Sequence, residues 1–94
     1  MKYHVRATKQ YKKDYKRTLQ TGKDVSKLEK IIDTLAAGEK LDDKHRDHAL
    51  KGNLKGKREC HIAPDWLLLY EKDNEKLLLL LLRSGDHRHV LNIE

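Results

Sequence analysis

The sequence predicts a single α+β domain, residues 1–94, in which a small antiparallel sheet carries a hairpin of two helices on one face. Three observations lead to this fold class. A short alternating segment lies near the start, two amphipathic segments with helical periodicity follow it, and three strand-like apolar segments occupy the second half. A chain of 94 residues is long enough for one domain with one small core. The expected order is strand, helix, helix, strand, strand, strand (β-α-α-β-β-β).

The first half carries the signals for one strand and two helices. Residues 3–7 alternate apolar and polar side chains, which predicts a short N-terminal strand. Thr8 and Asp24 each offer an N-cap, and Gly22 and Gly38 stand where helix ends favour glycine. Each helix has apolar residues on one face: Tyr11, Tyr15 and Leu19 in the first, and Leu28, Ile31, Ile32 and Leu35 in the second.

The second half begins with a polar connection over 39–53. Three strands are expected after it, at 54–62, 66–71 and 76–83. Pro64 cannot donate a hydrogen bond to a sheet, so it marks the turn between the first two. The six consecutive leucines at 77–82 predict a central strand that is covered on both faces or lies at a dimer seam. The tail, 86–94, is expected to add one short helical turn.

The charge of the chain is positive and unevenly distributed. The formal net charge is +6, and residues 1–23 hold eight Lys and Arg against one acidic residue. Residues 48–58 hold four basic residues and no acidic one. Such patches favour phosphate-rich or acidic partners, although the same charges also serve solubility alone.

The cysteine count and the apolar runs indicate a cytoplasmic protein. The single cysteine, Cys60, cannot form an internal disulfide and cannot build a cysteine-based zinc site. The N-terminal residues lack the apolar core of a signal peptide. The longest apolar run, 77–82, is far shorter than a membrane span, so we expect no membrane association.

Histidines gather in the second half of the chain. Five of the six come after residue 44: His45, His48, His61, His87 and His89. Histidine exchanges protons near neutral pH, and strand ends that are distant in sequence can meet at one rim of a sheet. Asp65 lies four residues after His61, across the Pro64 turn, and Trp66 offers either a flat stacking surface or a core side chain. An isolated loop histidine is also commonly just a solvated side chain.

The motifs that are missing narrow the chemistry. The sequence has no Gly-rich phosphate loop, no GxSxG and no HExxH. The close histidine pairs lack fixed acidic or cysteine partners, so we expect no metal and no other cofactor. Acid–base catalysis on a nucleophile supplied by the substrate fits better. RNA carries such a nucleophile, the 2′-hydroxyl, and its attack needs a base, an acid and cations.

Three segments together resemble a known family. They are DHALKG at 47–52, GKRECHIAPDWLLLY at 56–70 and RSGDH at 83–87. They resemble the YafQ branch of the RelE/ParE toxin superfamily, and the likeness extends along nearly the whole chain. The resemblance implies a RelE-like fold and the toxin of a bacterial type II toxin–antitoxin pair. Such toxins are mRNA interferases, which are endoribonucleases that cut messenger RNA in the ribosomal A site.

The resemblance also assigns roles to individual residues. The catalytic set that it implies is His48, His61, Asp65 and His87. It places Trp66 beside this set and Arg83 at a basic position that we assign to phosphate. We expect the substrate-binding set to include Lys51, Lys57, Arg58 and Leu91 as well. Leu91 is a departure, because the family usually has an aromatic residue, often Phe, at this position. His89 is an additional histidine without a family counterpart.

The resemblance implies partners as well. A cognate antitoxin wraps part of its chain around such a toxin, and an acidic segment that folds on binding would suit the basic regions 9–17 and 51–58. The ribosome and mRNA are the expected substrate complex, and operator DNA is expected only through the antitoxin complex. Two alternatives remain: a basic module of the same fold that binds RNA or protein without cutting, and an antitoxin partner whose main task is operator binding.

Overall fold

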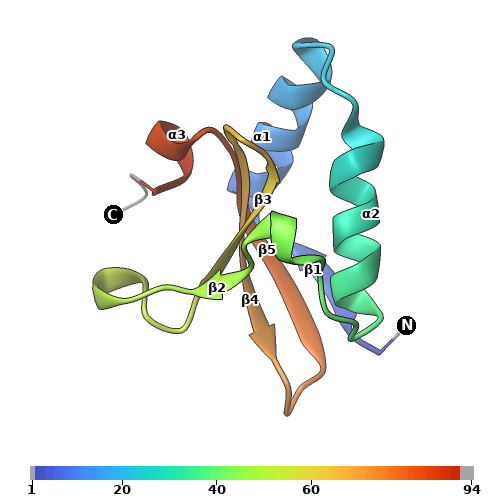
Figure 1. Ribbon diagram of the computed structural model, residues 1–94, viewed down its shortest axis with the longest axis vertical. Coiled ribbons are helices and arrows are strands. Elements are labelled where there is room, and N and C mark those ends of the chain that lie inside the picture. Colours follow the sequence, from blue (N-terminus) through green and yellow to red (C-terminus); the bar gives the residue numbers. More distant parts are fainter. Residues whose placement is uncertain (1, 92–94) are drawn as a thin grey trace.

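The computed structural model describes residues 2–91 and contains the predicted elements together with one additional short strand (Figure 1). The strands are β1 (His4–Ala7), β2 (His48–Ala49), β3 (Arg58–Ala63), β4 (Trp66–Asp73) and β5 (Leu78–Gly85). The helices are α1 (Lys9–Gln20), α2 (Val25–Ala36) and α3 (His87–Leu91), with two 3₁₀ turns, η1 (Asp43–His45) and η2 (Gly52–Leu54). Within the described residues, no helix has the length and apolar character needed to cross a membrane.

The predicted N-caps begin both long helices. The Thr8 hydroxyl accepts a hydrogen bond from the backbone N–H of Tyr11 at 3.0 Å and donates one to the carbonyl of Leu82 at 2.8 Å. The cap therefore also attaches the start of α1 to β5. The Asp24 carboxylate accepts from the backbone N–H of Ser26 at 3.1 Å, which begins α2.

The five strands form one sheet in the order β1-β5-β4-β3-β2. Strands β2 to β5 pair antiparallel, as predicted, but β1 pairs parallel with β5, with His4 opposite Leu78. The sheet is therefore mixed rather than antiparallel throughout. A parallel pair cannot be joined by a tight hairpin, and here the helices and three other strands form the long connection. The leucine-rich strand lies between β1 and β4, so its predicted place inside the sheet is confirmed. Its predicted cover on both faces is only partial, because Leu79 and Leu81 are buried while the leucines that alternate with them are half-buried.

The connection at 39–53 is more ordered than the sequence predicts. It contains η1, β2 and the start of η2. The two residues of β2 pair with Glu59 and Arg58 of β3. A two-residue strand is too short to show any periodicity, so only its pairing with β3 reveals it. The expected strand at 54–62 begins at Arg58, because η2 ends at Leu54 and a turn at 55–56 follows it. The short helical turn predicted in the tail is α3, and residues 92–94 lie outside the described part.

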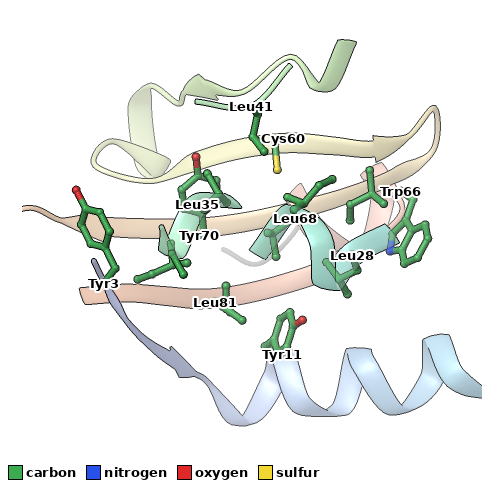
Figure 2. Close-up of a cluster of buried hydrophobic side chains, with 14 residues drawn as sticks. Tyr3, Tyr11, Leu28, Leu35, Leu41, Cys60, Trp66, Leu68, Tyr70 and Leu81 are labelled. Carbon is green, nitrogen blue, oxygen red and sulfur yellow. The ribbon is translucent and has the colours of Figure 1, made fainter. Parts of the chain in front are cut away.

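The main core fills the space between the helical hairpin and the sheet (Figure 2). It contains Leu28 and Leu35 of α2, and Leu68 and Tyr70 of β4, all at most 1% exposed. The other face of β4 is also covered, where a second cluster joins Leu67 and Leu69 of β4 to Val90 of α3. Figure 1 shows α3 on the opposite side of the sheet from α1 and α2. The hairpin lies on one face, as predicted, and β4 is buried on both faces.

A buried carboxylate joins α1 to the end of β5. Asp14 is 1% exposed and accepts hydrogen bonds from the Arg83 Nε and Nη2 atoms, each at 3.0 Å, and from the backbone N–H of Ser84 at 3.1 Å. Gln10 donates another at 3.1 Å. Burial raises the pKa of the Asp14 carboxyl, but these hydrogen bonds outweigh burial and leave the pKa below its usual value.

Replacing this carboxylate should strongly destabilise the fold. Asp14→Asn leaves the Arg83 cation buried without its counter-charge, and breaking one partner of a buried pair costs about 3–5 kcal/mol. The free energy of unfolding in urea measures the loss, with Asp33→Asn on the exposed face of α2 as the matched control.

The stability that Asp14→Asn loses should decrease as the pH falls. Because folding lowers the pKa of Asp14, the carboxylate stabilises the protein above about pH 4 and loses this effect as the pH falls further. The gap between wild type and Asp14→Asn should therefore narrow in acid. A gap that widens in acid would contradict the assignment.

Candidate active site

Strand β3 divides its side chains between the core and the opposite face of the sheet. Cys60 and Ile62 belong to the main core beneath the helices. Side chains alternate along a strand, so Glu59 and His61 point to the other face. The register places His48 of β2 directly opposite Glu59. The short strand β2 thus brings a distant histidine beside β3.

Glu59 is a buried carboxylate between two histidines. It is 4% exposed, and its Oε1 atom lies 3.6 Å from the His61 Nε2 and 3.9 Å from the His48 Nε2. Its Oε2 atom is the one buried side-chain polar atom in residues 2–91 without a hydrogen-bond partner. The His48 Nδ1 contacts the carbonyl of Arg46, and a carbonyl only accepts, so this nitrogen carries the hydrogen. The His48 Nε2 is therefore the ring atom that faces Glu59.

His87 begins α3, and two carboxylates hold the start of this helix, Asp65 through His87 and Asp86 through His89. Gly85 has φ +152°, a conformation that favours glycine, and lets the chain leave β5. Asp86 then caps α3 by accepting from the backbone N–H of His89 at 2.9 Å and lies 2.8 Å from the His89 Nδ1. Asp65 accepts from the backbone N–H of His87 at 3.4 Å and lies 3.1 Å from its Nδ1. The Nδ1 of His87 is used in this contact with the carboxylate, so its Nε2 remains for other contacts.

The residues around Glu59 and the pair formed by His87 and Asp65 meet at one rim of the sheet. The His61 and His87 ring centroids lie 5.5 Å apart at an angle of 61°. The side chains thus form a continuous series from His48 through Glu59, His61 and His87 to Asp65, which we call the histidine–carboxylate cluster. The structure brings together all four residues predicted as catalytic and adds Glu59. The signal for Glu59 was its spacing of two from His61, which places both on one face of a strand.

Two predicted substrate residues use their polar groups within the fold. Arg83, with a side chain 15% exposed, holds Asp14 with two hydrogen bonds. Trp66 is 4% exposed, donates from its Nε1 to the Ser84 hydroxyl at 3.2 Å, and has the Lys23 Nζ 5.3 Å from its ring centroid. The phosphate and stacking roles of Arg83 and Trp66 stay predictions, and each would require the side chain to leave these contacts.

The other predicted substrate residues differ in whether their polar groups are already used within the fold. Arg58 donates from its Nε to the Asp47 carboxylate and to the Tyr70 hydroxyl, each at 3.3 Å. The Lys57 Nζ lies 3.5 Å from the Glu71 carboxylate, and Lys51 is exposed. Leu91 ends α3, but its side chain lies outside the described part of the structure.

Cys60 has low reactivity as a nucleophile, although it lies between Glu59 and His61 in the sequence. Its side chain lies on the core face, and burial raises the pKa of its thiol to about 12. The thiolate, which is the nucleophilic form, is therefore scarce near neutral pH. This agrees with chemistry that uses a nucleophile from the substrate.

The cluster has the composition of a metal site even though no metal was expected. Glu59, His61 and His87 each offer one ligand atom, and these atoms lie within 4.8 Å of one another. This set is not one of the histidine pairs that are close in sequence, because Glu59 and His61 of β3 meet His87 of α3 through the fold. Imidazole and carboxylate together suit a transition metal ion. The expectation of metal-independent chemistry stays a prediction.

Comparisons with known proteins point to one family. The family model described as the bacterial toxin of type II toxin–antitoxin system, YafQ, matches residues 3–92. The mRNA interferase toxin YafQ of Escherichia coli strain K12 is 37% identical over 79 residues, which are 83% of this chain and 84% of the relative.

Solved structures agree with the sequence comparison. A copper-bound mutant toxin from Helicobacter pylori is 41% identical with a TM-score of 0.88, and the match covers 94% of this chain and 98% of that one. The YafQ chain of the E. coli DinJ–YafQ complex is 30% identical with a TM-score of 0.87, over 96% and 99% of the two chains. The similarity therefore spans the whole histidine–carboxylate cluster.

Proposed function

Because the chain belongs to the YafQ family of toxins from bacterial type II toxin–antitoxin systems, we propose that its histidine–carboxylate cluster cleaves messenger RNA on the ribosome. The enzyme is an mRNA interferase, as its curated relatives are named. The observation that carries the proposal is the contact between the two histidine–carboxylate groups, His61 with Glu59 and His87 with Asp65. The cytoplasm, where ribosomes translate, is the proposed site of action.

The chemistry is an internal transfer at phosphorus. A base removes the proton of the RNA 2′-hydroxyl, the 2′-oxygen attacks the adjacent phosphate, and the bond from phosphorus to the 5′-oxygen breaks. An acid protonates that 5′-oxygen, which leaves a 2′,3′-cyclic phosphate and a 5′-hydroxyl. The His61 and His87 rings are close enough for one phosphate to contact both. The two imidazoles take the acid and base roles between them.

The carboxylates prepare each imidazole for its role. Asp65 holds the His87 Nδ1 and thereby orients the ring with Nε2 free for proton exchange. Glu59 is nearly excluded from water, and its Oε1 atom lies 3.6 Å from the His61 Nε2, so its carboxylate helps to orient the His61 ring. The same Glu59 oxygen lies 3.9 Å from the His48 Nε2, which places a second imidazole beside this carboxylate.

The partner of such a toxin is an antitoxin, as in the E. coli DinJ–YafQ complex. We infer that an acidic segment of the cognate antitoxin binds the exposed lysines of α1 and the basic region 51–58, where charges of one sign attract it. Operator DNA is bound through that complex rather than by the toxin alone.

Removing the His87 imidazole should cripple cleavage without unfolding the protein. A general acid or base contributes about 10²–10⁴-fold, so His87→Ala should lower single-turnover cleavage on programmed ribosomes by roughly that factor. His89→Ala is the matched control, because that ring lies against Asp86 at the start of α3. Normal cleavage by His87→Ala, together with a crippled His89→Ala, would overturn the assignment of the site.

Neutralising Glu59 should lower the rate while keeping the shape of the side chain. Glu59→Gln removes the charge next to His61, and we expect a loss of roughly 10²-fold in the same assay. Glu59→Asp keeps the charge and should retain more activity, and Glu39→Gln on the exposed surface serves as the control. Equal activity of Glu59→Gln and wild type would remove Glu59 from the mechanism.

Cleavage should survive removal of transition metals, because protein side chains supply the acid and the base. The test uses a chelator selective for transition metals and keeps magnesium at the level that ribosomes need. Loss of cleavage that zinc, copper or manganese restores would show instead that Glu59, His61 and His87 act as metal ligands.

A further inference from the structure

A groove runs along the free end of β3, between α2 and the connection that contains η1. Its volume is about 1020 Å³. The short strand β2 pairs only with Arg58 and Glu59, so the edge of β3 beyond Glu59 is left to this connection. The His45 Nδ1 fills part of that edge by donating to the carbonyl of His61 at 2.7 Å.

The charged residues that line the groove are mainly positive. Five cationic side chains line it: Lys27 and Lys30 from α2, and Lys40, Lys44 and Arg46 from the connection. The one carboxylate in its lining is Asp42. A concave surface with charges of one sign concentrates ions of the opposite sign, so this groove attracts an anionic chain.

The groove reaches the catalytic cluster. His61 and His87 are part of its lining, so an anion that lies in it is continuous with a phosphate held between the two rings. Its floor is aliphatic, with Ile31 of α2, Ile62 of β3 and Pro64 of the following turn. Apolar faces between cations suit a single strand, whose riboses and bases contact the floor while its phosphates meet the lysines.

We propose that this groove holds the sugar–phosphate backbone of the mRNA on one side of the cleavage point. The proposal rests on the proposed function, because it assigns a path to the substrate of the same site. From Lys27 to Thr34, α2 rises about 10 Å, so the path is short and takes a few nucleotides. The direct connection to His61 and His87 favours RNA over an acidic antitoxin segment as its occupant.

The test compares two double variants with the same change in charge. Lys27→Gln with Lys30→Gln alters the groove, and Lys12→Gln with Lys13→Gln alters the exposed face of α1 outside it. We call the first pair of changes the groove variant and the second the α1 variant. In single-turnover cleavage on programmed ribosomes, the protein concentration that gives the half-maximal rate should be roughly tenfold higher for the groove variant than for wild type. The slope of log affinity against log salt should become shallower by about 1.4 for two lost phosphate contacts. The α1 variant should change much less.

Messenger RNA with uncharged backbone linkages tests whether the groove lysines contact the mRNA itself. Methylphosphonates replace the phosphates flanking the cleavage point and remove their charge. They should weaken cleavage by wild type and by the α1 variant about equally, and should weaken the groove variant clearly less, because its contact is already lost. An equal additional loss in the groove variant would overturn the proposal and leave ribosomal RNA as the partner.

Two further measurements distinguish a failure of the groove proposal from a failure of the proposed function. The affinity for the cognate antitoxin should stay unchanged in the groove variant, and a selective loss there would make the antitoxin the occupant. If wild type does not cleave at all, the proposed function fails, and filter binding to the same programmed ribosomes still tests the groove. Equal binding by wild type and the groove variant would then overturn the inference.

Discussion

The buried Asp14 carboxylate fixes the end of β5, and the arrangement of the site depends on it. Asp14 accepts hydrogen bonds from Arg83 and Ser84, the last residues before the chain turns at Gly85. His87 follows two residues later, so its distance from His61 is set from this point. A rigid attachment has catalytic value, because small misplacements of reacting groups lower rates steeply.

Burial of both faces of β4 makes the rest of the rim rigid. Leu68 and Tyr70 pack beneath the helices, while Leu67 and Leu69 pack beneath α3. The neighbouring strand β3 contrasts with it, because its outer face carries Glu59. That carboxylate is buried with one oxygen unpaired, which costs stability. Such a polar group is tolerated where it acts on a neighbour, and here the neighbours are His48 and His61.

The positive charge of the chain is divided between two surfaces by the helical hairpin. Both helices share one core, yet α1 faces outward with its own lysines and α2 faces the groove that ends at the cluster. These two separate basic surfaces match the two partners proposed above, an acidic antitoxin segment on α1 and RNA in the groove. The net charge of +6 alone does not distinguish them.

The sequence by itself determined what local physics encodes. The caps at Thr8 and Asp24, the apolar helix faces, the Pro64 turn and the leucine-rich strand follow from backbone chemistry and periodicity. The motif resemblance identified the four residues that the fold brings to one rim. Only the tertiary structure decided the parallel pairing of β1 with β5, the two-residue strand β2, the Asp14–Arg83 pair and the place of Glu59. The first three depend on contacts between distant segments, for which no local pattern in the chain is a signal. The spacing of two in the sequence places Glu59 on the same strand face as His61, but only the fold brings His48 and His87 to that face.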